Sequence, residues 1–390
     1  MSLHDVVLID AVRTPFGKAG GVYANTRSDD LGVAVVKALI ERNGIDPALV
    51  EDVGIAATSQ TGDQGLTLGR SIGLLAGLPN TVPGYAVDRM CSGALTATTQ
   101  IASEIACGMI DVGIAGGVEH MGRHPIGASM DVNPRFVVER MVAPDALNMG
   151  VTAENLHDLF PSLTKQRADQ YAVASQRKTA AAYAEQRFAA QLIPVAARDA
   201  EGAWALVTKD EPPRPDTSME GLASLKTPFR PNGRVTAGNA SGINDGATAA
   251  LLMSAEKAQV LGLTPRARMV AYAFAGVAPE IMGYGPVPST EKALAKAGLT
   301  IADMDVIEIN EAFAVQVLSF LEHFGLADDE VRVNPFGGAI AVGHPLATSG
   351  VRLMANMLEF FSSNPSAKYG LTTMCIGLGM GATVIWENMR

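Results

Sequence analysis

The chain has 390 residues, a length typical of two to three domains, and 48% of them are hydrophobic, which is enough for a large core. Its formal net charge of −10 and pI of about 5.1 argue against nucleic acid or an anionic membrane as its main partner. No apolar run reaches the roughly 18 residues of a membrane span, and the N-terminus lacks the basic region of a secretory signal. We therefore expect a protein that binds neither nucleic acid nor membranes.

Cysteine and histidine are scarce. The chain has three cysteines and six histidines, and no group of them has the spacing of a zinc site. The cysteines are not closely spaced in pairs, which indicates reduced thiols and a cytoplasmic protein. We expect no metal.

The first half alternates strands and helices, which predicts a mostly parallel sheet covered by helices. Ser28 or Asp29 is a plausible N-cap for the first helix. We expect strands at Val6–Ile9, Val53–Ala57, Gly84–Val87 and Val112–Ala115, and helices at Ser28–Arg42, Leu66–Leu75 and Ser92–Cys107.

The second half repeats this scheme. The same 38 positions separate Val53 from Cys91 and Val306 from His344, and each interval runs strand, helix, strand and then a residue that opens a long helix. This agreement predicts an internal duplication, too long in period for a solenoid. We expect strands at Ala267–Phe274, Val306–Glu308, Val331–Val333, Leu371–Cys375 and Ala382–Trp386, and helices at Ser289–Ala297, Phe313–His323 and from His344 to about Phe361.

A segment of different composition, residues 119–239, lies between the halves. It is richer in Met, Pro, Arg and Asp, and it has one clear helical pattern, at about 164–187 with Ser162 as a possible N-cap. We interpret it as a loop domain over the active-site face, because loops of this length are usually functional. The N-terminal half would then comprise residues 1–118, completed by about 240–262, and the C-terminal half residues 263–390.

Two residues in small-residue turns predict a nucleophile and its base. Cys91 lies between a strand and a helix, where unpaired N–H groups and the helix dipole favour the thiolate. His344 also opens a helix, with Pro345 at its first position, and this setting favours a neutral imidazole that can take the proton of Cys91. Each alone also fits a structural role, as a buried cysteine or a helix-capping histidine.

A second thiol completes the pattern. Cys375 ends a predicted strand and is followed by glycines at 377, 379 and 381. Such a turn exposes backbone N–H groups for an oxyanion, and a second thiol suits proton removal from the carbon next to a thioester. The same glycines fit a packing turn or a phosphate loop, but no Gly-Lys-Ser/Thr follows them. We expect Cys107, late in an apolar helix, to be a core residue.

An asparagine follows another predicted strand. The uncharged amide of Asn310 can hold a water molecule or donate to a carbonyl oxygen. We interpret the next residue, Glu311, as a structural carboxylate that binds backbone N–H groups.

Seven motifs in one order resemble those of the thiolases, acyltransferases that cleave or form 3-oxoacyl-CoA. The resemblance covers the whole chain. The motifs are Arg13–Lys18, Asp88–Leu95, Met149–Asn155, Thr236–Ala247, Asn310–Phe313, Gly337–Pro345 and Cys375–Gly381.

The resemblance implies a five-layer α-β-α-β-α fold built from two duplicated halves with an inserted loop domain, and a homodimer or homotetramer. It implies ping-pong chemistry in which Cys91 carries the acyl group, His344 takes its proton and Cys375 is the general acid and base. One oxyanion hole would use His344 and a water held by Asn310. The other would use the backbone N–H groups of Cys91 and Gly377.

The resemblance also implies the CoA site. No cofactor is expected to stay bound, since coenzyme A and acyl-CoA are substrates, and a hydratase-dehydrogenase partner stays undecided. Lys226, Arg230 and Arg234 form a basic cluster near the expected site, or an ordinary solvated surface. The residues implied around CoA are Ser241 and Ala240 on the pantetheine loop, Arg214 near the adenine, and Met149, Met282 and Phe313 around the pantetheine and acyl group.

The chain departs from the family pattern at three places, and the last two favour a degradative enzyme for broader acyl chains over a biosynthetic acetoacetyl-CoA thiolase. Gly93 and Ala94 stand where the nucleophile turn usually reads Ser-Gly, Leu378 replaces a frequent glycine, and Asn148 stands where short-chain enzymes usually have histidine.

Other functions are less consistent with these residues. A decarboxylating condensing enzyme, such as a 3-oxoacyl synthase or hydroxymethylglutaryl-CoA synthase, would need two active-site histidines, or a histidine and an asparagine in other contexts. This chain instead offers one histidine in a glycine turn and a second cysteine. A non-catalytic CoA-ester binding protein on this scaffold would be expected to lack one of the four residues, and all four are present.

Overall fold

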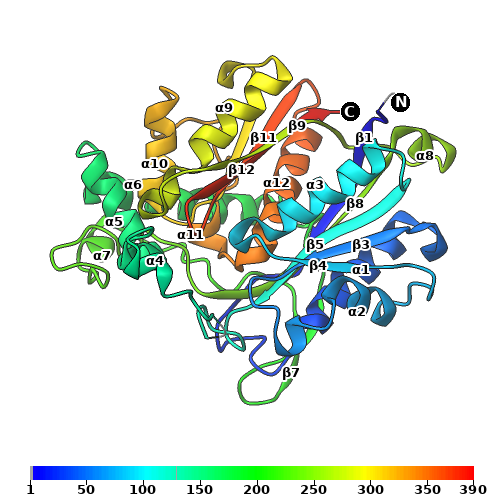
Figure 1. The fold of residues 1–390 in the computed structure, drawn as a ribbon, viewed down its shortest axis with the longest axis horizontal. Helices are drawn as coiled ribbons and strands as arrows, with labels where there is room; N and C mark the ends of the chain where they lie inside the picture. Colours follow the sequence, from blue (N-terminus) through cyan, green and yellow to red (C-terminus); the bar gives the residue numbers. More distant parts are fainter. Residues whose placement is uncertain (1–2, 129) are drawn as a thin grey trace.

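A computed structural model describes residues 3–128 and 130–390. Its main sheet follows the order β10-β11-β12-β9-β1-β8-β5-β3-β4, and β2 pairs with β8 (Figure 1). The strands of the N-terminal half are β1 (Val6–Arg13), β2 (Gly17–Lys18), β3 (Asp52–Ala56), β4 (Tyr85–Val87), β5 (Val112–His120) and β8 (Asn244–Ser254). Those of the C-terminal half are β9 (Ala267–Gly276), β10 (Val306–Ile309), β11 (Tyr369–Ile376) and β12 (Met380–Asn388).

The strand order shows the duplication. From the junction outward, the N-terminal half runs β1-β8-β5-β3, with two antiparallel pairs followed by a parallel pair. The C-terminal half runs β9-β12-β11-β10 with the same sequence of pairings. Among the described residues, the two half-sheets meet at two residue pairs, Val7 with Arg268 and Leu8 with Ala267. The predicted strand at Val331–Val333 is wrong. In the C-terminal half, an isolated bridge between Ile307 and Val333 takes the place that the pairing of β3 with β4 has in the N-terminal half.

Helices complete five layers, as expected from the resemblance. Three separate apolar cores lie outside the first half-sheet, between the half-sheets and outside the second. Figure 1 shows α3 and α12 in the central layer. The outer layers are α1 (Ser28–Asn43) with α2 (Leu68–Leu75) and α9 (Pro286–Ala297) with α10 (Ala314–His323); the central helices are α3 (Gly93–Ala106) and α12 (Ser349–Ser363).

Several boundaries differ from the predicted ones because of local capping. Arg27 occupies the N-cap position of α1, and Thr164 caps α6 through a hydrogen bond to the Arg167 N–H, in place of Ser162. Cys107 is exposed at the C-cap of α3, so its assignment to the core is wrong.

The inserted segment contains more regular structure than one helix. It has α4 (Arg135–Val138), α5 (Met149–Leu159), α6 (Lys165–Ala184), α7 (Met219–Ala223) and a hairpin of β6 (Val195–Arg198) and β7 (Trp204–Val207). None of the helices in the described residues is long and apolar enough to cross a membrane.

A buried ion pair joins the inserted segment to the end of β1. Both side chains of the pair are fully buried, and the Arg13 guanidinium donates to both oxygens of Asp210, at 2.6 and 2.9 Å. The Phe16 N–H and the Tyr183 hydroxyl also donate to this carboxylate. The turn at residues 13–16 is therefore a structural anchor for the segment.

Replacing Asp210 tests this anchor. Asp210→Asn leaves the Arg13 charge buried without its partner, so we expect a loss of about 3–5 kcal/mol of stability, measured as a lower urea midpoint and Tm. Asp328→Asn is the control, because Asp328 pairs with Arg167 at the surface, where a pair contributes less than about 1 kcal/mol. Equal losses in the two variants would contradict the anchoring role.

Candidate active site

The nucleophile candidate lies in a strained turn. Cys91 belongs to the short helix η3 (Met90–Ser92), directly before α3, and it is half-buried. Met90 has φ of 45°, a conformation that costs energy for a residue with a side chain and is found at functional turns.

His344 is held by its backbone. It lies between α11 (Ala339–Val342) and η7 (Leu346–Thr348), and α12 begins only at Ser349. The expectation that His344 opens a long helix with Pro345 at its first position is therefore wrong; Pro345 precedes η7 as its N-cap. The His344 N–H donates to Asn244 Oδ1 at 3.0 Å, and Asn244 Nδ2 donates to the Gly17 carbonyl.

The imidazole has a polar partner on each side. Nδ1 lies 2.6 Å from the Ser349 hydroxyl, and Nε2 lies 3.2 Å from Nδ2 of Asn310. Asn310 directly follows β10, and its N–H donates to the carbonyl of Thr373 on β11. Since an amide nitrogen only donates, Nε2 is the acceptor and the proton of the neutral ring sits on Nδ1.

The two cysteines meet across the two halves. Cys375 is buried near the end of β11, and the N–H groups of Gly377 and of Cys91 itself both bind the Cys91 sulfur. A Cβ on Gly377, two residues after Cys375, would lie 2.5 Å from the Met90 sulfur, so the turn that follows Cys375 packs against the turn of Cys91. A Cβ on Gly93 would lie 3.1 Å from Ala347, so the turn of Cys91 packs on η7, directly after His344 and Pro345.

Burial decides the protonation states. It raises the pKa of Cys91 to about 11, although the N–H groups of Gly377 and Cys91 lower it, and it also raises the pKa of Cys375. The expectation of a thiolate at Cys91 is therefore wrong for the resting protein. Burial, with the charge of Arg352, lowers the pKa of His344 to about 3, so this ring is neutral as expected, but for a different reason.

Glu311 is structural, as predicted. It accepts hydrogen bonds from the Ile340 N–H and from Tyr171, Ser175 and Asn334 side chains. The carboxylate thus ties α6 to α11, the short helix that precedes His344.

Most residues implied around CoA belong to the same apolar cluster as the second thiol. Met282, Phe313 and Ala240 belong to the buried cluster that includes Cys375, and Met149 packs against it. Ala240 forms a β-bridge with Phe313, and the next N–H, of Ser241, donates to the Ala312 carbonyl. The loop at residues 240–241 is therefore fixed along the Asn310 motif.

A cleft of about 300 Å³ continues from this loop to the surface. Arg214 and Lys18 contribute positive charges to its lining, Ala240 contributes an apolar wall, and Asn244 connects it to the His344 backbone. Ser241 and the three apolar residues Met149, Met282 and Phe313 are not part of this lining.

The basic cluster at Lys226, Arg230 and Arg234 has another role. Arg230 and Arg234 both bind Asp158, and Arg234 lies 3.6 Å from Glu154. None of the three cations lines the cleft, so the structure favours the alternative of ordinary surface residues.

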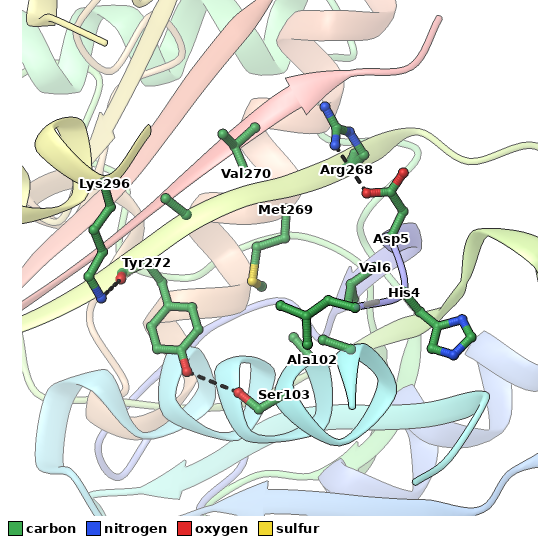
Figure 2. Close-up of a pocket in the computed structure, with 13 residues that line it drawn as sticks. His4, Asp5, Val6, Ala102, Ser103, Arg268, Met269, Val270, Tyr272 and Lys296 are labelled. Carbon is green, nitrogen blue, oxygen red and sulfur yellow. Dashed lines mark hydrogen bonds and ion pairs between the residues drawn. The ribbon is translucent and has the colours of Figure 1, made fainter. Parts of the chain in front are cut away.

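A second hollow, of about 440 Å³, lies far from these residues. Figure 2 shows it between β9 and α3, with the Tyr272 hydroxyl bonded to Ser103 and Lys296 bonded to the Tyr272 carbonyl. It contains none of the expected site residues. Within residues 3–128 and 130–390, no group of His, Cys, Asp and Glu side chains could hold a metal ion.

Three residues that hold the site were not predicted: Asn244, Ser349 and Arg352. Arg352 carried a signal, because a lone arginine in the apolar helix at 349–361 needs a buried partner. Ser349 and Asn244 carried none, since their partners are distant in sequence or depend on loop shape.

Comparisons with known proteins agree with this geometry. The family models described as "Thiolase, N-terminal domain" and "Thiolase, C-terminal domain" match residues 6–256 and 263–388. The 3-ketoacyl-CoA thiolase of Saccharophagus degradans is 46% identical, and both chains are covered completely. That of Idiomarina loihiensis is 44% identical over 99% of this chain and 100% of the relative.

A solved structure has the same fold. The crystal structure of the Bacillus anthracis acetyl-CoA acetyltransferase matches with a TM-score of 0.89 and 35% sequence identity, covering 99% of each chain. The family models together span nearly the whole sequence, and the two curated relatives match it end to end. This chain belongs to the thiolase family.

Proposed function

We propose that this chain is a degradative thiolase of fatty acid β-oxidation. It uses CoA to cleave a 3-oxoacyl-CoA into acetyl-CoA and an acyl-CoA shortened by two carbons. The observation that supports this most is the meeting of two thiols from the two halves, with two backbone N–H groups directed at the first sulfur. The full-length curated relatives named 3-ketoacyl-CoA thiolase support the degradative direction.

The first half-reaction breaks a carbon–carbon bond. The Cys91 sulfur attacks the 3-oxo carbon while its proton passes to Nε2 of His344, and the oxygen becomes negative. The N–H groups of Cys91 and Gly377 donate to that oxygen. The protonated Nε2 and the Nδ2 of Asn310, which lies 3.2 Å from it, donate to the thioester oxygen, which becomes negative as the carbon–carbon bond breaks. The bond between carbons 2 and 3 breaks, carbon 2 takes the proton of Cys375, and acetyl-CoA leaves the acylated Cys91.

The second half-reaction restores the thiols. The Cys375 thiolate takes the proton of an incoming CoA thiol, whose sulfur attacks the acyl carbon on Cys91. The N–H groups of Cys91 and Gly377 stabilise this second oxyanion. Cys91 leaves as a thiolate and regains its proton from His344.

The cleft of about 300 Å³ is the proposed CoA site. Arg214 and Lys18 would bind the phosphates, which carry the negative charge of CoA. The loop of Ala240 and Ser241 would lie along the pantetheine, and the apolar cluster of Met149, Met282 and Phe313 would contact its end and the acyl chain.

A thiolysis assay over a series of 3-oxoacyl-CoA substrates tests the function. We expect turnover of acetoacetyl-CoA and of longer chains, with the longer chains preferred, whereas a biosynthetic acetoacetyl-CoA thiolase would accept only the shortest. Cys91→Ala should abolish turnover and the acid-stable label from radioactive acyl-CoA. Cys375→Ala should keep the label but lose transfer to CoA. Full transfer by Cys375→Ala would contradict the role of the second thiol.

The low pKa of His344 predicts a pH-dependent stability. The imidazole of His344 has a pKa of about 3 in the folded protein and of about 6.5 in the unfolded chain. Between pH 3 and about pH 6.5, proton binding to this imidazole therefore favours the unfolded state. Stability is unaffected above about pH 6.5 and falls below it, by about 2 kcal/mol at pH 5. The Tm of His344→Gln should therefore decrease less from about pH 7 to 5 than that of the wild type. His323→Gln, at the surface, is the control; equal decreases in all three proteins would contradict the neutral buried imidazole.

We also propose that the chain forms a cytoplasmic homodimer or homotetramer. Its three cysteines are free, which suits a reducing compartment. β4 pairs with β3 on one side, and its other edge has no strand partner among the described residues. The Val87 carbonyl bonds the Ala57 N–H, so the N–H of the preceding Ala86 points to the free edge, where a second copy can extend the sheet.

Mass measurement in solution tests the assembly. We expect two or four times the chain mass of 40.7 kDa, and a lower mass for Ala86→Pro, because proline removes the edge donor. Ala205→Pro, in the β6–β7 hairpin, is a control at another short strand. A wild-type mass of 40.7 kDa would contradict the proposal.

A further inference from the structure

A buried guanidinium lies directly behind the catalytic amide. Arg352 on α12 is fully buried, and its Nη2 donates to Oδ1 of Asn310 at 2.9 Å. This is the one hydrogen bond of its side chain among the described residues, and Nε and Nη1 have none. Burying a charge costs several kcal/mol, and here the single bond that offsets part of that cost goes to a residue of the site.

The direction of this bond decides which way the amide faces. A guanidinium only donates, so Oδ1 of Asn310 must face Arg352 and Nδ2 must face His344. Nε2 of His344 is then the acceptor, and Nδ1 donates its proton to Ser349, 2.6 Å away. A flipped amide would place Oδ1 against Nε2 and favour the opposite tautomer, in which Nε2 carries a proton and cannot take another.

Arg352 itself lies beside a second buried ionisable group. Glu308 on β10 is fully buried, with Oε2 lying 3.7 Å from Nη1 of Arg352. The Asn356 amide donates to the same oxygen at 3.1 Å and accepts from Gln191, which in turn accepts from Arg13. The polar contacts therefore continue from the site to the ion pair that anchors the inserted segment.

We propose that Arg352 is a positioning residue, which fixes the Asn310 carboxamide so that His344 keeps Nε2 free of a proton. The inference rests on the proposed function, because it acts through the roles of Asn310 and His344. The charge of Arg352 acts in the same direction, since it contributes to the low pKa of His344.

A double-mutant cycle separates positioning from a merely structural role. Arg352→Met should lower kcat for thiolysis of acetoacetyl-CoA by about 100-fold, with KM for CoA unchanged, because a misplaced catalytic group slows the chemistry. Asn310→Ala should lower kcat by about 10²–10³-fold. In the Asn310→Ala background, Arg352→Met should cost nothing further, because there is no amide left to orient. The same 100-fold loss in both backgrounds would overturn the inference.

Controls keep this test decisive. Arg266→Met removes another largely buried arginine, paired with Asp10, and should lower stability without lowering kcat. Arg352→Lys keeps a charge and should recover only part of kcat, because one ammonium does not reproduce the planar donor. If Arg352→Met does not fold, Glu308→Gln combined with Arg352→Met carries the same cycle, since it leaves no unpaired buried charge.

A direct readout of the tautomer completes the test. In ¹⁵N-histidine-labelled protein, the His344 signal, assigned by its loss in His344→Gln, should indicate the Nδ1–H form in the wild type and a shift toward Nε2–H in Arg352→Met. An unchanged signal would overturn the inference. Failure of wild-type thiolysis with the Nδ1–H signal intact would instead refute only the proposed function.

Discussion

The carboxylate of Glu119 holds the two halves together at the site. It is buried on β5 of the N-terminal half and accepts hydrogen bonds from the Thr58 N–H and hydroxyl, from Gln64 and from the Ala347 N–H of the C-terminal half. A buried carboxylate must keep its donors, so η7 cannot move away from β5 without leaving that charge unsatisfied. Because His344 lies three residues before Ala347, this bond places the His344 imidazole beside the turn of Cys91.

The inserted segment is attached by the same kind of interaction. Glu311 binds Tyr171 and Ser175 of α6, and Asp210 binds Arg13 at the end of β1. Glu311 directly follows Asn310 in the chain. Asp210 is connected to Asn310 through a series of buried polar side chains. The segment that supplies Met149 and Arg214 is therefore fixed to both halves by charges that must stay paired, which keeps the cleft aligned with the thiols.

The sequence predicted what is local and missed what depends on burial. The periodicity of α1 gave both its ends within one residue, and the repeated spacing predicted a duplication that the strand order shows. The thiolate expectation at Cys91 failed because helix-terminus arguments assume solvent, whereas burial here dominates the pKa. Asn244 was quoted within a motif but not given a role, because its partner Gly17 is distant in sequence and only the folded chain brings them together.

A neutral resting site explains why so many orientations are fixed. With Cys91 as a thiol and His344 as a neutral imidazole, the two side chains form no ion pair at rest, and in the proposed mechanism their charges form only during attack. Groups that receive those charges must already point the right way, since reorienting dipoles in a dry pocket would add to the barrier. The strained φ values of Met90 and Leu378, 45° and 62°, place the turns of the two cysteines against each other, and buried hydrogen bonds hold the amide and the imidazole. In the proposed mechanism, reactivity therefore comes from geometry that the core maintains, not from a thiolate prepared in advance.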